Sequence, residues 1–589
     1  MTSSAKGAAP VRTRTTLAMI ADDYHVSKVE RVLDGASDRA TEHGINLVCA
    51  VMPAAPEQCP IRDLIGPANC DGVMVLSSIV SNFERSQERI REFFKSFEPL
   101  PCVSLGDPFE GVRSIKVDNR SGMRDVISHL IKVHHIHKIA FIRGPVTNLE
   151  AEERFAVYQQ VLEENGIPFD PDLVAEGNWT HASGATAVYT LKDLRHRKFA
   201  AIAAANDAMA GGAFEALHAR GIRVPLDVAV VGFDNFDGTG YALTTVNQPV
   251  YEMGRRAADM VLALSQGKSG EPQLVTLPTE VVLRRSCGCF GADVRNAAAE
   301  TAPTSPVSLL ALRREAISQA ILRAASGADA EAPPEWPGRL FAAFLHEMTD
   351  GKRGELLSEL DAILMQEWLE RRHSRTWQDV ISELRREALP CLGPHAVVSA
   401  ENIWHQARVL IAEAAQRVRA HRDHLYSLRT LKLMDVSTVF PCTDIKTLAE
   451  NFAQRMPALG IERCYAVVFE SDGDGDGHGP GSGDGAKPEW SRLIMALDEE
   501  ESTPLDSEGI RFPARQLLPP DVLPDYRPVT LIALPLAKAG RNMGIIFFEK
   551  SDVEFYIYQT LARQFSEPLS RIAAPGCASA QSAAAPAAG

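Results

Sequence analysis

Residues 200–235 read AAIAAANDAMAGGAFEALHARGIRVPLDVAVVGFDN and carry the pattern that decides the fold. Apolar runs at 200–204 and 228–232 predict two buried strands, and the spacing over 209–220 predicts a helix between them. Gly221 ends this helix, because glycine adopts the left-handed conformation that closes helices. A strand, a helix and a further strand in this order are typical of a parallel α/β sheet covered on both faces.

The same alternation extends back toward the N-terminus. It predicts further strands at 17–21, 45–51, 72–76, 102–105 and 138–142, and helices at 29–43, 84–97, 123–133 and 152–165. We therefore predict an α/β domain over residues 15–289, preceded by a disordered tail at 1–14. Because this length is large for one sheet, we expect two similar lobes.

Polar and aromatic side chains follow the predicted strands. An open α/β sheet binds its ligand beyond the carboxyl ends of its strands. Carboxylates and amides there can bond hydroxyl groups, while aromatic rings cover flat apolar faces. For any single residue the alternative is a helix N-cap, which fits Asp207 well. The set comprises Asp22, Asp23, Tyr24, His25, Ser77, Ser78, Asp118, Arg154, Trp179, Asn206, Asp207, Phe233, Asp234 and Asn235.

Three segments together resemble the effector domain of the LacI/GalR family of repressors. They are AANDAMAGGAFEAL at 204–217, GIRVPLDVAVVGFDN at 221–235 and LTTVNQP at 243–249. Earlier segments agree, among them VDN at 117–119 and IAFIRGP at 139–145. The resemblance covers about residues 15–287 and implies a periplasmic-binding-protein-like fold, in which three crossovers join two lobes.

The resemblance also narrows the candidate ligand-binding residues. Position by position, Arg154, Asn206 and Asp234 match family residues that contact the effector. Phe233 and Trp179 match positions that commonly line the pocket. The first-lobe candidates match positions that vary with ligand identity, and they are Asp22, Tyr24 and Ser77.

Family repressors carry a helix-turn-helix and a hinge helix before the first strand. In this chain the first strand begins near residue 16, and we see no replacement helix-turn-helix in the helical middle. The sequence therefore leaves direct DNA binding by this chain uncertain.

The remainder of the chain divides into three parts. Residues 290–307 have a linker composition, and residues 308–438 form a helical connector. A stripe from Trp404 to Leu428 has a 3-4-3-4 spacing, which is typical of a coiled-coil seam or of an ordinary core-facing helix. Residues 439–573 read as an α+β domain that resembles GAF domains, and residues 574–589 read as a disordered tail.

Several classes of site are not predicted. The net charge of −15 and the scattered basic residues offer no stripe for phosphates. Cys287 and Cys289 are too close for a usual zinc knuckle. His134, His135 and His137 cluster before a strand, but a metal site there would need further ligands that we cannot place, so we expect no metal. The run at 472–477 begins like a calcium loop, but Gly483 stands where glutamate is needed. No nucleophile–base pair appears, so we expect no enzyme and no cofactor.

The function predicted from the sequence is that of a ligand-sensing transcriptional or signalling regulator. It would bind a small metabolite, a sugar or a nucleoside-like compound, between the two lobes and transmit their closure to the C-terminal module. We expect a homodimer whose output acts through a protein partner. No apolar run is long enough for a bilayer and no signal segment is present, which predicts a cytoplasmic location. The alternative is a solute-binding protein of a transport system.

Overall fold

The structure, a computed structural model, describes residues 14–22, 26–52, 60–77, 86–235, 242–268, 270, 272–289, 308–326, 335–350, 354–369, 377–437, 442, 444–470, 488–498, 501–502, 509–520, 522–524, 526–538 and 541–572. By their contacts these residues form two compact units. One unit combines the chain up to Val282 with the chain from Leu431 onward, and the other spans Leu283–Thr430. Among the described residues, no helix is long and apolar enough to cross a membrane.

The first lobe is built on a parallel sheet with the strand order β11-β5-β4-β3-β1-β2. Every residue of β1 is buried, because helices cover both faces of the sheet. The strands are β1 (Thr16–Asp22), β2 (Asn46–Met52), β3 (Gly72–Leu76), β4 (Cys102–Leu105), β5 (Arg113–Val117) and β11 (Leu274–Leu277). The helices are α1 (Val26–Glu42), α2 (Pro60–Leu64), α4 (Gln87–Lys95) and α9 (Val250–Ser265).

The second lobe has a parallel sheet of order β7-β6-β8-β9 and an antiparallel pair, β10 with β12. Its strands are β6 (Ile139–Arg143), β7 (Val174–Glu176), β8 (Ala201–Ala204), β9 (Ala229–Val231), β10 (Thr245–Asn247) and β12 (Glu280–Val282). Its helices are α5 (Asn119–Lys132), α6 (Leu149–Glu164), α7 (His181–Tyr189) and α8 (Asp207–His218). The chain passes from one lobe to the other after β5, after β10 and after β11, which agrees with the expected two lobes and three crossovers.

Each lobe contains a helix pair whose backbones touch at two glycines. In the first lobe, a Cβ at Gly35 would lie 1.9 Å from the Tyr251 carbonyl oxygen, and one at Gly254 would lie 2.0 Å from the Val32 oxygen. In the second lobe, Gly184 of α7 and Gly212 of α8 make equally close approaches. Only residues without a Cβ allow these helices to pack so tightly.

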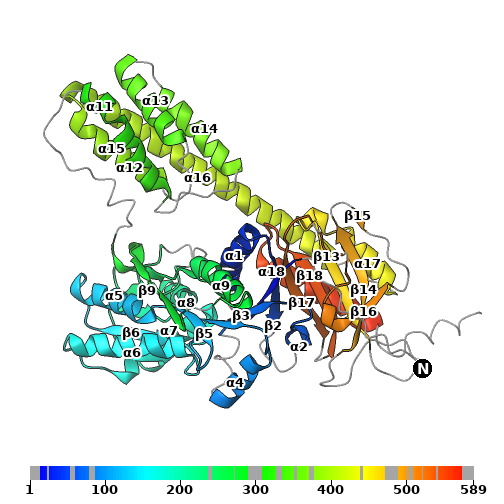
Figure 1. Cartoon of the computed structure of the whole chain (residues 1–589). Helices are drawn as coiled ribbons and strands as arrows, with labels where there is room; N and C mark the ends of the chain where they lie inside the picture. Colours follow the sequence, from blue (N-terminus) through cyan, green and yellow to red (C-terminus); the bar gives the residue numbers. More distant parts are fainter. Residues whose placement is uncertain are drawn as a thin grey trace, which may run out of the picture. The chain divides into compact units, whose positions relative to one another are not determined.

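The C-terminal α+β region contains α17 (Ile445–Ala453), β13 (Cys464–Phe469), β14 (Trp490–Asp498), β15 (Glu501–Ser502), β16 (Ile510–Pro513), β17 (Thr530–Lys538), β18 (Arg541–Glu549) and α18 (Phe555–Ile572). Its strands form an antiparallel sheet of order β17-β18-β13-β14-β15, and β16 pairs with β14. This sheet is continuous with the first lobe, because β17 pairs in parallel with β2 (Figure 1).

The second compact unit is helical. Its helices are α11 (Ser308–Leu312), α12 (Arg314–Ser326), α13 (Trp336–Asp350), α14 (Glu355–Leu369), α15 (Trp377–Ala388) and most of α16 (Pro394–Ser437). The predicted stripe begins on α16 with Trp404, Ala407 and Ile411, which are buried in the core of this unit. This part of the stripe therefore faces the unit's own core, whereas the side chains of Val418, Leu425 and Leu428 lie outside the described residues. So do residues 1–13, 290–307, 472–477 and 574–589.

Candidate ligand-binding site

Arg154 is the centre of a buried cluster of polar and aromatic groups. It lies on α6 and is 2% exposed. Its Nε donates to Asn119 Oδ1 at 2.9 Å, and its Nη1 donates to the carbonyl oxygen of Ala205 at 2.7 Å. Asn119 begins α5 and Ala205 follows β8, so the guanidinium links two elements of the second lobe.

Phe233 and Asp234 follow β9 and reach the same guanidinium. The Cζ of Arg154 lies 3.9 Å from the centroid of the buried Phe233 ring. The Nη1 of Arg154 lies 3.9 Å from Asp234 Oδ1, which also accepts a hydrogen bond from Gln248 Nε2. Asp234 has a φ of 132°, a conformation that residues with a side chain rarely adopt. Strained backbone of this kind is typical of functional sites.

Asn206 has a structural task as well as a place in the cluster. Its Oδ1 accepts from the Met209 N–H at 2.9 Å, so Asn206 is the N-cap of α8. The interpretation of Asp207 as the cap is therefore wrong, because the capping oxygen must come from the extended residue that precedes the helix. Asp207 is instead fully buried and accepts from Thr245 Oγ1 at 2.6 Å.

Trp179 is brought to the cluster by Asn206. The Nδ2 of Asn206 donates to the Trp179 carbonyl oxygen at 3.1 Å, and Trp179 has a positive φ of 70°. The indole ring packs over Gly144, where a Cβ would come within 2.7 Å of it, and lies 5.8 Å from the Arg154 Cζ. The five predicted second-lobe residues therefore lie together, as one cluster of charge, amide and ring faces.

The structure says less about the predicted binding residues of the first lobe. Asp22 is buried at the end of β1. Ser77 is also buried, and its Oγ accepts from the backbone N–H of Asp107 at 2.6 Å, which is a structural role. Tyr24 lies outside the described residues. The hydrogen bonds and the ion pair given above for Arg154 all join it to residues of the second lobe.

Two ion pairs between the lobes were missed by sequence reasoning. Lys28 Nζ of α1 lies 3.1 Å from Glu150 Oε2 of α6, and both side chains are largely buried. Lys116 Nζ of β5 lies 3.0 Å from Glu153 Oε1 of the same helix. Neither pair has a local signal, because its members are far apart in sequence. Asn119 and Gln248 were also missed, although both lie inside the motifs quoted above.

The chemistry of the cluster suits a ligand with hydroxyl groups and a flat face. Within the described residues, the Nη2 of Arg154 is buried and has no hydrogen-bond partner. A buried donor without a partner is costly, and an acceptor oxygen of a ligand would satisfy it. The carboxylate of Asp234 can accept from a hydroxyl, and the rings of Trp179 and Phe233 can cover an apolar face.

Comparison with known proteins gives consistent matches. A family described as a periplasmic binding protein-like domain matches residues 127–287. The chain is 37% identical to the HTH-type transcriptional regulator CelR of Thermobifida fusca, over 43% of this chain and 74% of that protein. It is 31% identical to the HTH-type transcriptional regulator AscG of Escherichia coli K12, over 42% and 74%. A crystal structure of the Escherichia coli repressor ascG aligns with a TM-score of 0.40 at 29% identity, over 46% of this chain and 98% of that one.

Proposed function

Because the chain belongs to the LacI/GalR family of transcription regulators, we propose that it is a regulator that senses a small metabolite. The metabolite is a sugar or a nucleoside-like compound, and it binds between the two lobes. The relatives reported above are named as transcription regulators, so the alternative of a transport protein is not favoured. We also propose that the chain acts as a transcriptional or signalling regulator in response to this metabolite.

The buried Nη2 of Arg154 is the observation that carries the proposal. Asn119 and the Ala205 carbonyl hold the other guanidinium nitrogens in place, so this donor is preorganised. A ligand oxygen bound there would replace the water that solvates an open site, and the adjacent carboxylate of Asp234 would read a second hydroxyl.

Closure of the lobes is the step that converts binding into a signal. The ion pairs Lys28–Glu150 and Lys116–Glu153 bridge the lobes and favour the arrangement in which they touch. A ligand that contacts both lobes adds to this preference and shifts the population further. The ligand must therefore bind the closed arrangement more tightly than the open one. Contacts to one lobe alone would be the same in both arrangements and would not produce this difference.

The C-terminal α+β region, which we take to be GAF-like, is the receiving module. It shares a sheet with the first lobe, where the Leu47 N–H donates to the Val529 oxygen at 2.9 Å. The second lobe leads, by chain connection, into the helical unit, whose last helix runs on to the same region. Closure thus moves one attachment point of the helices relative to the other. We propose that this happens within a homodimer, which then acts on a protein partner.

The direct test is titration of the purified full chain with sugars and nucleosides, cellobiose and adenosine among them. Binding is read by isothermal calorimetry and by the melting temperature. We expect at least one compound to raise the melting temperature, by an amount that grows with the logarithm of its concentration relative to Kd. The Arg154→Lys variant should bind it at least about tenfold more weakly, because lysine lacks the planar fork. The exposed Arg120, which donates to Gln160 on the surface, supplies the control Arg120→Lys.

Two results would contradict the proposal. One is a compound that binds wild type and Arg154→Lys equally well. The other is a folded, monodisperse chain that no sugar or nucleoside stabilises.

A further inference from the structure

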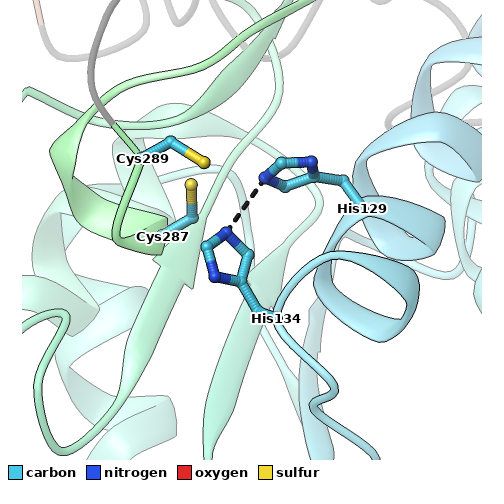
Figure 2. A group of neighbouring side chains, drawn as sticks. All are labelled: His129, His134, Cys287 and Cys289. Carbon is cyan, nitrogen blue, oxygen red and sulfur yellow. Dashed lines mark hydrogen bonds between the residues drawn. The ribbon is translucent and has the colours of Figure 1, made fainter.

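Four potential metal ligands converge at the end of α5, far from the cluster around Arg154. They are His129, His134, Cys287 and Cys289, and Figure 2 shows their side chains pointing toward one another. One ligand atom from each residue lies within 4.8 Å of the others. No metal was expected here from the sequence, because the two cysteines are closer together than in a usual zinc knuckle and the histidine cluster lacked further ligands.

The two histidines meet because the chain reverses after α5. His129 is on the last turns of the helix, which ends at Lys132. His135 adopts a positive φ of 55°, and the Ile136 N–H donates back to the Leu130 oxygen at 3.0 Å. This reversal returns His134 to the level of His129, and their Nε2 atoms lie 3.1 Å apart.

The two cysteines meet because of the glycine between them. Cys287 ends a short 3-10 helix, Arg285–Cys287, which follows β12. Gly288 has a φ of 106° and its N–H donates to the Arg285 oxygen at 2.9 Å, so the chain turns sharply. Glycine is the residue that tolerates this conformation. Cys289 is thereby placed beside Cys287, and the pair faces the histidines.

From this geometry we propose that the four side chains bind one Zn²⁺ ion in a tetrahedral structural site. Zn²⁺ prefers thiolate and imidazole ligands, and two of each are present. Bond lengths of about 2.0–2.3 Å imply ligand atoms about 3.3–3.8 Å apart in a tetrahedron. The Nε2–Nε2 distance of 3.1 Å is close to this, so small side-chain shifts suffice. Mg²⁺ and Ca²⁺ are disfavoured, because they select oxygen ligands.

The position of the site defines what the metal would do. Cys287 and Cys289 are the last residues before the segment that leads to the helical unit, and α5 carries the histidine end of the site. The other end of α5 is Asn119, which binds Arg154. A helix of this length spans about 20 Å. The ion would therefore fasten the exit of the effector domain to a helix that reaches the ligand cluster, without touching that cluster.

The test uses the full chain, stripped of metal by a chelator under reducing conditions and titrated with Zn²⁺ or Co²⁺. We expect one equivalent to bind, with Zn²⁺ raising the melting temperature. Co²⁺ should give thiolate charge-transfer absorption and the strong visible bands of a tetrahedral complex. We expect Zn²⁺ binding to weaken more than about a hundredfold in Cys287→Ser, Cys289→Ser and His134→Ala. Substituting a residue that only hydrogen-bonds a metal ligand costs less, about ten- to a hundredfold.

Matched control variants show whether the metal binds to these four side chains or to other histidines and cysteines of the chain. His137→Ala removes an exposed histidine close to the site, and Cys442→Ser removes a partly buried cysteine elsewhere, so both should keep the cobalt spectrum. Circular dichroism identifies any variant that fails to fold, and the titration of wild type decides the question without variants. Failure of wild type to bind one equivalent would overturn the proposal, as would unchanged thiolate absorption in Cys287→Ser. Because metal content is measured without an effector, this outcome is independent of the proposed sensing function.

Discussion

The guanidinium of Arg154 lies over the face of Phe233, with its Cζ 3.9 Å from the ring centroid. The ring is fully buried, so the attraction between the cation and the ring acts without competition from water. Phe233 therefore does more than fill the space beneath a ligand. It fixes the plane of the guanidinium and so sets the direction of the Nη2 donor that the proposed ligand would meet.

The first prediction concerns this pair. Phe233→Leu should weaken effector binding by about tenfold, because a desolvated cation–π contact contributes roughly 1–2 kcal/mol. The affinity is measured by calorimetry. Phe155→Leu is the matched control, since Phe155 lies on α6 and its ring is 4.4 Å from the Cζ of a different arginine, Arg143. Equal losses of affinity in both variants would show that the Phe233 contact has no special role.

A second prediction follows from the bridge between the lobes. Lys28→Met should lower effector affinity by at least about fivefold, because removing one member of a largely buried ion pair leaves the other charge unpaired. The reason is that Lys28 contacts Glu150 across the lobes and favours their closure. Arg91→Met breaks the pair Arg91–Glu110 within the first lobe and should leave the affinity unchanged. An increase in affinity for Lys28→Met would mean that the bridge opposes the bound arrangement.

The third prediction concerns pH and the contact between α1 and the C-terminal region. Burial raises the pKa of Glu30 above its ordinary value of 4.5, and the nearby carboxylate of Asp34 adds to this, while Lys550 opposes it. A raised folded-state pKa means that Glu30 favours the folded state below pH 4.5, and that this contribution is lost as pH rises through the raised value. Glu30→Gln should therefore raise the melting temperature at neutral pH, with a gain that shrinks toward pH 4.5.

Glu42 provides the control of opposite sign. Hydrogen bonds from Arg255 and then Arg39 lower its pKa to about 2, so its stabilising contribution is present above pH 4.5 and fades as pH falls toward 2. Glu42→Gln should lower the melting temperature at neutral pH, by a small amount because the site is exposed. Parallel pH profiles for the two variants would contradict both assignments.

Much of the fold follows from local sequence. The runs at 72–76 and 102–105 coincide with β3 and β4, because a strand buried on both faces is mostly apolar. The proximity of the second-lobe candidate residues was also predictable, since Asn206 and Asp234 follow strands that end at one edge of the sheet. Asp207 was misread because a cap and the first helical residue are neighbours with the same preferences.

Other features depend on contacts between distant residues, and no local pattern encodes them. Strand β17 pairs with β2, although Thr530 and Leu47 lie in separate regions of the sequence. Both strands are apolar. This composition predicts that each strand is buried, but it does not determine which strand pairs with it. The converging pairs His129–His134 and Cys287–Cys289 were missed for the same reason, because spacing rules describe ligands from one short segment.

The fourth prediction tests the close helix contact in the second lobe. A Cβ at Gly212 would lie 1.9 Å from the His181 carbonyl oxygen, so α7 and α8 would have to separate. Gly212→Ala should lower the free energy of unfolding by about 1–3 kcal/mol in denaturant titration. Gly338→Ala is the control: nothing lies within 4 Å of a Cβ at that position in α13, and the change should stabilise its unit by up to about 1 kcal/mol. A neutral Gly212→Ala would show that the helices tolerate a wider spacing.

The last prediction tests the shared sheet. Ser37 Oγ of α1 and Thr530 Oγ1 of β17 lie 2.9 Å apart and both residues are buried, so Ser37→Cys with Thr530→Cys should form a disulfide under mild oxidation. Peptide mapping by mass spectrometry detects the bond. Each single variant shows whether the new cysteine instead forms a disulfide with Cys49, a residue of β2 that lies opposite Ile532 of β17. If the C-terminal region moves with the first lobe, the bond leaves effector affinity unchanged, because closure displaces the other lobe. A cross-linked chain that no longer binds its effector would mean that β17 has to leave β2 during closure, and the proposed route of the signal would be wrong.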